Sequence, residues 1–178
     1  MRELKKEGIY TDQLTDEFMN DVVNSAPLHD IGKIQVSDTI LNKPGKLTDD
    51  EFEIMKTHTT AGAEVIRHAM NTVSEENSGY LKEAMNLAHY HHEKWNGTGY
   101  PCGLKGEAIP LSARIMAVAD VFDALVSKRS YKDGFPFEKA MSIIREGSGS
   151  HFDPKIAQAF INASDEVRRV MNSGESID

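Results

Sequence analysis

The sequence predicts an all-α protein, a bundle of about six to eight helices. Apolar residues recur with helical spacing in several segments, and no segment alternates apolar with polar residues as a strand does. Helix-capping residues, glycines and prolines separate these segments. A chain of 178 residues is long enough for one domain with a sizeable hydrophobic core.

The first helix signals lie before residue 59. A short charged segment, residues 2–7, ends at a glycine. Thr15 caps an acidic first turn, and Pro27 should kink the helix that follows. Residues 48–51 read Thr-Asp-Asp-Glu, the pattern of a capping box, and open a helix that we expect to reach about residue 58.

The middle of the chain predicts two further helices and a long loop. A second short helix is expected over residues 60–70, and the polar residues 71–79 are expected to form a loop. Residues 96–110 contain four glycines and two prolines and predict a structured loop, which in a compact domain is usually functional. The helix between these loops has one apolar face, formed by Leu81, Ala84, Met85, Ala88 and His92.

Three helices are predicted after the long loop. Residues 111–127 form the first, and residues 137–146 form the second. Asp153 and Pro154 cap a last helix that reaches about residue 171, where the domain ends; residues 172–178 are expected to be a disordered tail. The buried stripe predicted for the first of these helices is Ile115, Val118, Ala119 and Phe122.

Composition restricts the class of protein. A net charge of -8 argues against nonspecific binding to DNA or RNA, which needs a broad basic surface. No apolar run is long enough to span a bilayer, and no signal peptide is recognised near Met1. The single Cys102 excludes an internal disulfide and fits a reducing compartment. We therefore expect a cytoplasmic domain without membrane contact.

Four histidines and two aspartates predict a metal site. Imidazole and carboxylate together suit divalent cations such as Fe, Mn or Zn. Each of these residues lies in or beside a predicted helix, so helix packing can bring them to one point. An unpaired carboxylate in an apolar helix would be costly, and one of the aspartates stands in such a helix. The set is His29, Asp30, His58, His91, His92 and Asp120.

Taken singly, these residues have ordinary alternatives. His29 and Lys33, with a glycine between them, also fit a helix C-terminus, where cationic side chains meet the helix dipole. Adjacent histidines such as His91 and His92 are common on a protein surface. The remaining histidines are not assigned to the metal; they are His68, His89 and His151.

Basic residues near the proposed ligands predict a phosphate clamp. Lys33, Arg129 and Lys132 are the candidates, and a solvated basic patch is the alternative for them. Asp123, one turn after Asp120, is expected to orient a ligating histidine.

In combination these motifs resemble the HD-GYP family of metal-dependent phosphodiesterases, a branch of the HD superfamily. Each motif is weak alone, but the combination is specific, and the resemblance extends from about Ser25 to Phe160. The matching residues are His29-Asp30-Ile31-Gly32-Lys33, His58, His91-His92-Glu93, Gly99-Tyr100-Pro101 and Asp120 with Asp123, Arg129 and Lys132. The segments Leu41-Asn42-Lys43-Pro44-Gly45 and His151-Phe152-Asp153-Pro154 also match.

The resemblance implies a fold and a reaction. The fold would be an HD-type helical bundle with two or three divalent metal ions, Fe or Mn first and Zn, Ni or Mg as alternatives. The reaction would be hydrolysis of cyclic di-GMP, or a related bacterial cyclic dinucleotide, to a linear dinucleotide or mononucleotides. Such modules usually follow a sensory or receiver domain in bacteria.

The resemblance also implies roles for individual residues. The six residues of the metal set would be ligands, with Asp30 bridging two ions, and Asp30, Lys33 and Asp123 would serve catalysis. The residues that meet the substrate would be Lys33, Gly99, Tyr100, Pro101, Arg129 and Lys132.

The sequence departs from the family in one respect. The family places a further metal-ligand histidine, in some members with a glutamate one turn before it, on a helix well before the His-Asp pair. None of the residues before His29 is a histidine, and we expect residues 2–7 to be the end of that helix. Glu3 or Glu7 would be the substitutes. We therefore expect an under-occupied metal cluster with little hydrolysis, and an uncovered apolar surface that favours a homodimer.

Two other functions stay open at this stage. One is a catalytically impaired signalling or interaction module that keeps the fold. The other is an HD phosphohydrolase that acts on another nucleotide, against which the Gly99-Tyr100-Pro101 loop argues.

Overall fold

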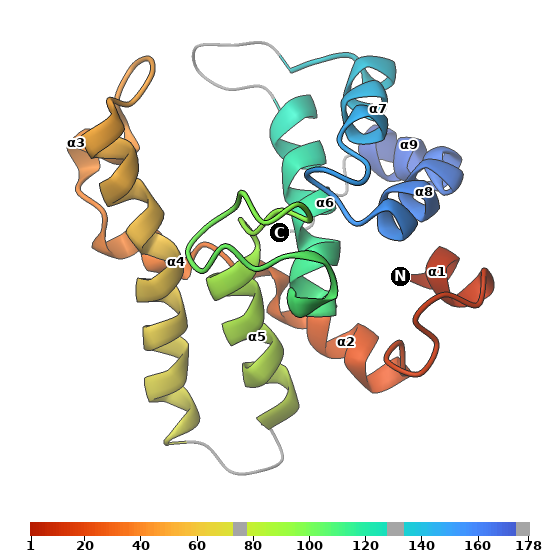
Figure 1. Ribbon diagram of the computed structural model, residues 1–178, viewed down its shortest axis with the longest axis horizontal. Helices are drawn as coiled ribbons and strands as arrows, with labels where there is room; N and C mark the ends of the chain where they lie inside the picture. The colour runs from red at the N-terminus through yellow and green to blue at the C-terminus, as the bar shows by residue number, and fades with distance from the viewer. Residues whose placement is uncertain (73–77, 128–133, 174–178) are drawn as a thin grey trace.

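The computed structural model describes residues 1–72, 78–127 and 134–173, and confirms the all-α prediction (Figure 1). These residues form nine α-helices, three short 3-10 helices and no strand. The helices are α1 (Arg2–Lys6), α2 (Asp16–Ser25), α3 (Asp38–Leu41), α4 (Asp49–Met70), α5 (Ser78–Tyr90), α6 (Leu111–Val126), α7 (Phe137–Glu146), α8 (Pro154–Asn162) and α9 (Ser164–Ser173), with the 3-10 helices η1 (Ala26–Leu28), η2 (Ile31–Gln35) and η4 (Gly106–Ala108).

The helices pack as two groups that meet at α6. In one group, α4 lies along α5, and α2 and η2 pack against that pair. In the other, α7 and α8 pack against α6, and α1 packs against α8 (Figure 1). The larger core belongs to the second group and includes Leu4, Val118, Phe122, Ile144 and Ile156. Because α6 also contacts α5, it connects the two groups.

The predicted helix starts are confirmed where local chemistry determines them. The Thr15 side chain accepts a hydrogen bond from the Phe18 N–H at the start of α2. Thr48 and Glu51 form the reciprocal capping box of α4. Pro27 does not kink this helix as expected: α2 ends at Ser25, and Pro27 lies in η1, because proline has no N–H to continue the helical hydrogen bonds.

Three other predictions about the helices were wrong. Residues 49–70 form one continuous helix, α4, rather than two. The last helix is interrupted at Ala163, so that α8 and α9 are separate, and α9 continues through Ser173. Ala119 is exposed rather than part of the buried stripe of α6. The predicted tail after Ser173 lies outside the described residues.

Candidate metal centre

The six predicted metal ligands come together at the point where α4, α5 and α6 meet η1 and η2. His29 and Asp30 lie between the two 3-10 helices, His58 is in α4, and Asp120 is in α6. The remaining two predicted ligands, His91 and His92, directly follow the last residue of α5.

Asp30 lies at the centre of this cluster. Its Oδ1 atom is 3.4 Å from Nε2 of His58 and 3.7 Å from Nε2 of His91. Its Oδ2 atom is 3.4 Å from Nε2 of His29, which is in turn 3.7 Å from Oδ1 of Asp120. Ligand atoms of four residues, those of Asp30, His58, His91 and His92, all lie within 4.8 Å of one another. Two ligand atoms that bind the same ion, each at about 2.0–2.2 Å, are separated by similar distances.

The backbone fixes which nitrogen of three imidazoles faces the centre. Nδ1 of His29 is 2.7 Å from the Ala26 carbonyl oxygen, and Nδ1 of His58 is 2.6 Å from that of Met55. His91 repeats the arrangement, with Nδ1 2.8 Å from the carbonyl oxygen of the residue four before it. Because a carbonyl oxygen only accepts, each Nδ1 must carry the proton. In a neutral ring, Nε2 then presents its lone pair to the centre, as in metal-binding histidines.

Three polar atoms in the cluster are buried without a hydrogen-bond partner in the described part of the chain. They are Oδ1 of Asp30, Nε2 of His58 and Nε2 of His91. Each such atom costs free energy unless a hydrogen bond or a cation compensates it. All three are acceptors that point to one place, so a divalent cation satisfies them together, whereas hydrogen bonds among themselves cannot.

The electrostatics of the cluster fit the same interpretation. Burial lowers the pKa of His91 to about 4 and that of His92 to about 3, so both rings are neutral at pH 7. Burial also acts to lower the pKa of His29, but the Asp120 and Asp30 carboxylates outweigh it and raise that pKa to about 10. Two carboxylates therefore hold a positive charge between them, which a divalent cation would also supply.

A close backbone approach brings Asp30 to His58. Gly32 in η2 lies against α4, and a Cβ atom there would be 1.9 Å from the His58 carbonyl oxygen and 2.4 Å from the Gly62 N atom. Only glycine allows the two segments to come this near. The Gly in the His-Asp-Ile-Gly-Lys run is therefore required for packing, and Gly62 is its counterpart on α4.

Glu93 fastens the glycine-rich loop to the end of α5. The residue is 2% exposed, and its carboxylate accepts hydrogen bonds from the N–H groups of Cys102 at 2.7 Å and Leu104 at 2.9 Å. At Gly99, a Cβ atom would be 2.3 Å from the Lys94 N atom, so the loop lies directly on the turn after α5. No role of its own was predicted for Glu93 from the sequence, although its position directly after two candidate ligands could have indicated one.

Tyr100 is the loop residue that reaches the cluster. Its N–H donates to the His92 carbonyl oxygen at 3.2 Å, and the two rings lie 4.8 Å apart between centroids. Burial, with the nearby Asp30 and Asp120 charges, raises the pKa of the Tyr100 phenol. The hydroxyl is therefore a neutral donor at pH 7. Pro101 follows it and is half-buried.

Of the basic and acidic residues predicted to assist the ligands, only Lys33 is seen at the cluster among the described residues. Nζ of Lys33 forms an ion pair with Oδ2 of Asp30 at 2.5 Å, at the edge of the cluster. Arg129 and Lys132 lie outside the described residues. Asp123 is exposed, and its role stays a prediction.

The carboxylates proposed to replace the further histidine face elsewhere. Glu3 pairs with Lys6 at 3.1 Å, and Glu7 accepts a hydrogen bond from the Asn162 side chain at 2.6 Å. Both lie on α1 or at its end, which packs against α8 on the other side of α6 from α4 (Figure 1). Neither supplies a ligand in this arrangement.

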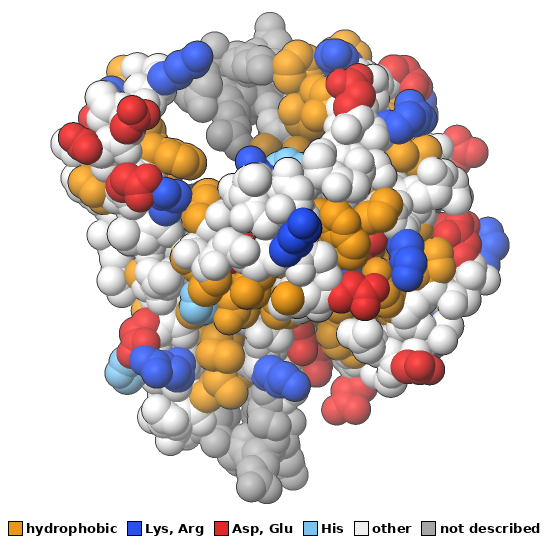
Figure 2. Space-filling view, in the orientation of Figure 1, with side chains coloured by type: hydrophobic (Ala, Val, Ile, Leu, Met, Phe, Trp, Pro, Cys, Tyr) orange, Lys and Arg blue, Asp and Glu red, His pale blue; other side chains and the backbone are white. Residues whose placement is uncertain are grey.

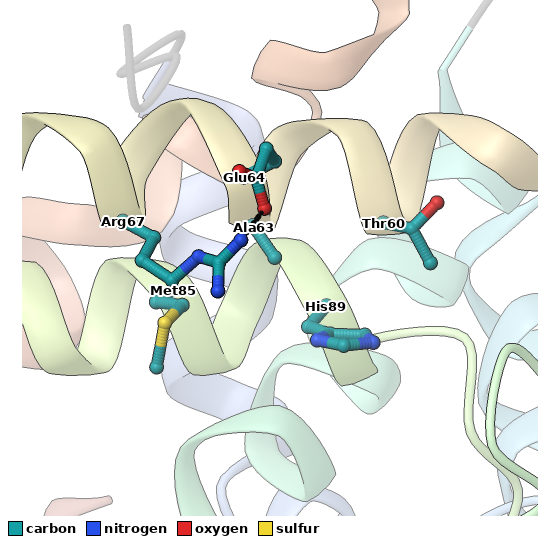
Figure 3. Close-up of a pocket in the computed structure, with 6 residues that line it drawn as sticks. All are labelled: Thr60, Ala63, Glu64, Arg67, Met85 and His89. Carbon is teal, nitrogen blue, oxygen red and sulfur yellow. Dashed lines mark hydrogen bonds and ion pairs between the residues drawn. The ribbon is translucent and has the colours of Figure 1, made fainter.

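A separate groove of about 290 Å³ lies between α4 and α5 (Figure 3). Arg67 and Glu64 form an ion pair with each other in it, and none of its residues is a candidate ligand. The candidate metal site is therefore the cluster around Asp30 and not this groove. The groove is lined by Thr60, Ala63, Glu64, Arg67, Met85 and His89.

Comparison with known proteins agrees with this geometry. A family model described as the HD domain matches residues 1–156. The chain belongs to the HD domain family. A cyclic di-GMP phosphodiesterase of Vibrio cholerae is 51% identical to this HD domain over 152 residues, which is 85% of the chain and 30% of that protein.

Other relatives of this HD domain bear related names. A cyclic di-GMP phosphodiesterase of Thermotoga maritima is 45% identical over 157 residues, 88% of the chain and 41% of that protein. A 3'3'-cGAMP-specific phosphodiesterase of V. cholerae is 42% identical over 145 residues, 82% of the chain and 26% of that protein. The chain thus spans less than half the length of these relatives.

A solved structure supports the fold assignment. The crystal structure of a cyclic GMP-AMP specific phosphodiesterase of V. cholerae superposes with a TM-score of 0.62 at 25% identity, covering 93% of this chain and 42% of that one. The HD-type helical bundle expected from the sequence is confirmed. No helix in the described residues is both long and apolar enough to cross a membrane.

Proposed function

We propose that this HD domain is a metal-dependent phosphodiesterase that hydrolyses a cyclic dinucleotide to a linear product. Cyclic di-GMP is the substrate that we propose first. The observation that carries the proposal is the convergence of three buried, unpartnered acceptor atoms from Asp30, His58 and His91. The names of the relatives, cyclic di-GMP and 3'3'-cGAMP phosphodiesterases, supply the substrate class.

The proposed ligands are the six residues of the cluster, with Asp30 between the others. Its two carboxylate oxygens face different histidines, which suits a bridging position. Imidazole and carboxylate donors favour Fe or Mn, with Zn as an alternative. Bound divalent cations supply Lewis acidity, which lowers the pKa of water and neutralises charge on phosphoryl oxygens.

The protein itself supplies position and charge. Lys33 lies at the edge of the cluster, where its ammonium can exchange the Asp30 carboxylate for a phosphate oxygen. Tyr100 presents a neutral hydroxyl beside His92, and Glu93 holds its loop in place. We include Arg129 and Lys132 in the phosphate clamp because they follow Asp120 closely in the sequence.

Turnover of the purified chain tests the proposal. The chain is loaded with Mn²⁺ or anaerobically with Fe²⁺, and the cleavage of cyclic di-GMP and of 3'3'-cGAMP is followed by chromatography. Asp30→Asn should reduce turnover by at least about a hundredfold, because it removes the central charge from the cluster. Asp12→Asn, a change of the same kind at an exposed position, should leave turnover unchanged. Equal turnover by Asp30→Asn and the wild type would contradict the proposal.

The second dinucleotide is included because the relatives differ in substrate. Cleavage of 3'3'-cGAMP at a higher kcat/KM than cyclic di-GMP would keep the reaction type and change the preferred substrate. No cleavage of either by the metal-loaded chain would favour the impaired module that the sequence left open.

A further inference from the structure

Two residues of α4 extend the row of rings that begins at the metal cluster. The Phe52 ring lies edge-to-face with the Tyr100 ring, with centroids 6.0 Å apart. Lys56, one turn after Phe52, places its Nζ atom 5.6 Å from the Phe52 centroid and 5.8 Å from the Tyr100 centroid. The Tyr100 ring in turn lies 4.8 Å from that of His92. A row of groups thus runs from the cluster outward to the start of α4.

The outer end of this row is open to solvent. Phe52 is 45% exposed, although it already contacts another aromatic ring. Figure 2 shows hydrophobic, basic and acidic side chains side by side on the visible face of α3 and the first half of α4. A ligand that binds at the candidate active site could bury this exposed aromatic surface.

Lys56 is held over these rings rather than extended into water. Its side chain is 26% exposed, and its ammonium forms an ion pair with Glu53 at 2.6 Å. Because Glu53 is 69% exposed, water competes for this pair, which costs little to rearrange. The ammonium therefore remains available to an acceptor placed against the two rings.

We propose that Phe52, Lys56 and Tyr100 form the binding place for one purine base of the substrate, and that Lys56 makes this place prefer guanine to adenine. The inference rests on the proposed function, which supplies the cyclic dinucleotide, and adds the residues that bind and select its base. Neither Phe52 nor Lys56 was a candidate from the sequence.

The hydrogen-bonding groups of guanine and adenine explain why Lys56 should prefer guanine. A base stacks on aromatic rings whatever its identity, so Phe52 and Tyr100 contribute affinity without selection. Guanine presents two adjacent acceptors, N7 and O6, on one edge, whereas adenine presents N7 with an amino donor. A lysine ammonium only donates, so Lys56 can bind the guanine edge and is repelled by the adenine amino group.

Binding measurements with the metal-loaded chain test both parts of the inference. Hydrolysis-resistant phosphorothioate analogues of cyclic di-GMP and cyclic di-AMP are titrated by calorimetry, so that the dissociation constant is read without turnover. Phe52→Ala should weaken binding of both analogues by about 5- to 100-fold. Phe52→Trp, which keeps a stacking surface, should restore the affinity. Lys56→Gln should reduce the preference for guanine by about tenfold.

Two exposed residues away from the row serve as controls. Ile54→Ala changes a side chain that is 47% exposed on the same helix, and Lys82→Gln removes a lysine from the surface of α5. Both should bind as the wild type does. The inference is overturned if the wild type binds cyclic di-GMP and neither Phe52→Ala nor Lys56→Gln changes the affinity or the preference. A metal-loaded wild type that binds neither analogue would overturn the proposed function as well.

Discussion

Replacing Gly32 by alanine should separate η2 from α4 and open the metal cluster. The added Cβ atom would lie 1.9 Å from the His58 carbonyl oxygen and 2.4 Å from the Gly62 N atom. Both neighbours are backbone atoms, so no side-chain rotation can relieve the contact. Real Cβ contacts are essentially never shorter than 3.0 Å, so the two segments must move apart by about 1 Å.

This displacement acts directly on the proposed ligands, because Asp30 precedes Gly32 by two residues and His58 carries the clashing carbonyl. The 3.4 Å separation between their donor atoms would increase, and one ion could no longer be held equally by both. We expect metal affinity to fall about 10- to 100-fold and turnover about a hundredfold. Overpacking should also lower the free energy of unfolding by about 1–3 kcal/mol.

Metal content after dialysis, thermal denaturation and turnover measure these three effects. Gly8→Ala is the control, because Gly8 has a φ of +72° and open space around it. Its alanine variant should lose about 1–2 kcal/mol from backbone strain but keep its metal. A folded Gly32→Ala variant that binds metal and turns over substrate like the wild type would show that the close approach at Gly32 does not position the ligands.

Three further substitutions test other parts of the account. Arg114→Met leaves the buried Asp153 carboxylate without the partner that donates to it at 2.7 Å; urea denaturation should show a loss of about 3–5 kcal/mol, and an unchanged midpoint would contradict a structural role. Glu93→Gln weakens the anchor of the glycine-rich loop; hydrogen exchange at the two donating amides should accelerate, with about 1–3 kcal/mol lost from stability, and unaltered exchange would exclude the anchor. Lys33→Ala removes the ion pair with Asp30; cyclic di-GMP should bind more weakly, with a smaller dependence on salt, while metal content stays the same, and unchanged affinity would remove Lys33 from the clamp.

Helix starts could be predicted from the sequence because their causes are local. Thr15, Thr48 and Asp153 each cap a helix through N–H groups two or three residues away. The same locality explains the wrong break in α4. The break was expected between residues 58 and 60, which lie inside α4. This part of the helix is held by the packing of η2 against it at Gly62, a contact that local sequence does not reveal.

The break between α8 and α9 had a weaker signal. Ser164 is followed by two acidic residues, which is typical of a helix start, but no glycine or proline precedes it. Ala163 leaves the helical conformation without a residue type that favours doing so. A break of this kind follows from how the two helices pack on the rest of the bundle, which the sequence does not display.

Residue types predicted which side chains gather at the candidate site, but not the residues that support them. Histidines and aspartates in an otherwise apolar setting indicate a metal, and the structure brings all six together. The buried Arg114 was not predicted, because its partner Asp153 lies 39 positions away and Tyr10 lies 104 away. Phe52 and Lys56 were missed for the same reason: their relation to Tyr100 exists only after α4 and the loop have packed.

The most direct test of the account is the metal content of the purified chain. After loading with Mn²⁺ and exhaustive dialysis, elemental analysis gives the number of ions per chain for the wild type and for His58→Asn. We predict at least one retained ion per wild-type chain, held by the cluster around Asp30. The His58→Asn variant should lose this ion, because an amide does not replace the buried Nε2 atom as a metal ligand. A wild-type chain that retains no metal, or a variant that retains as much as the wild type, would contradict the metal centre.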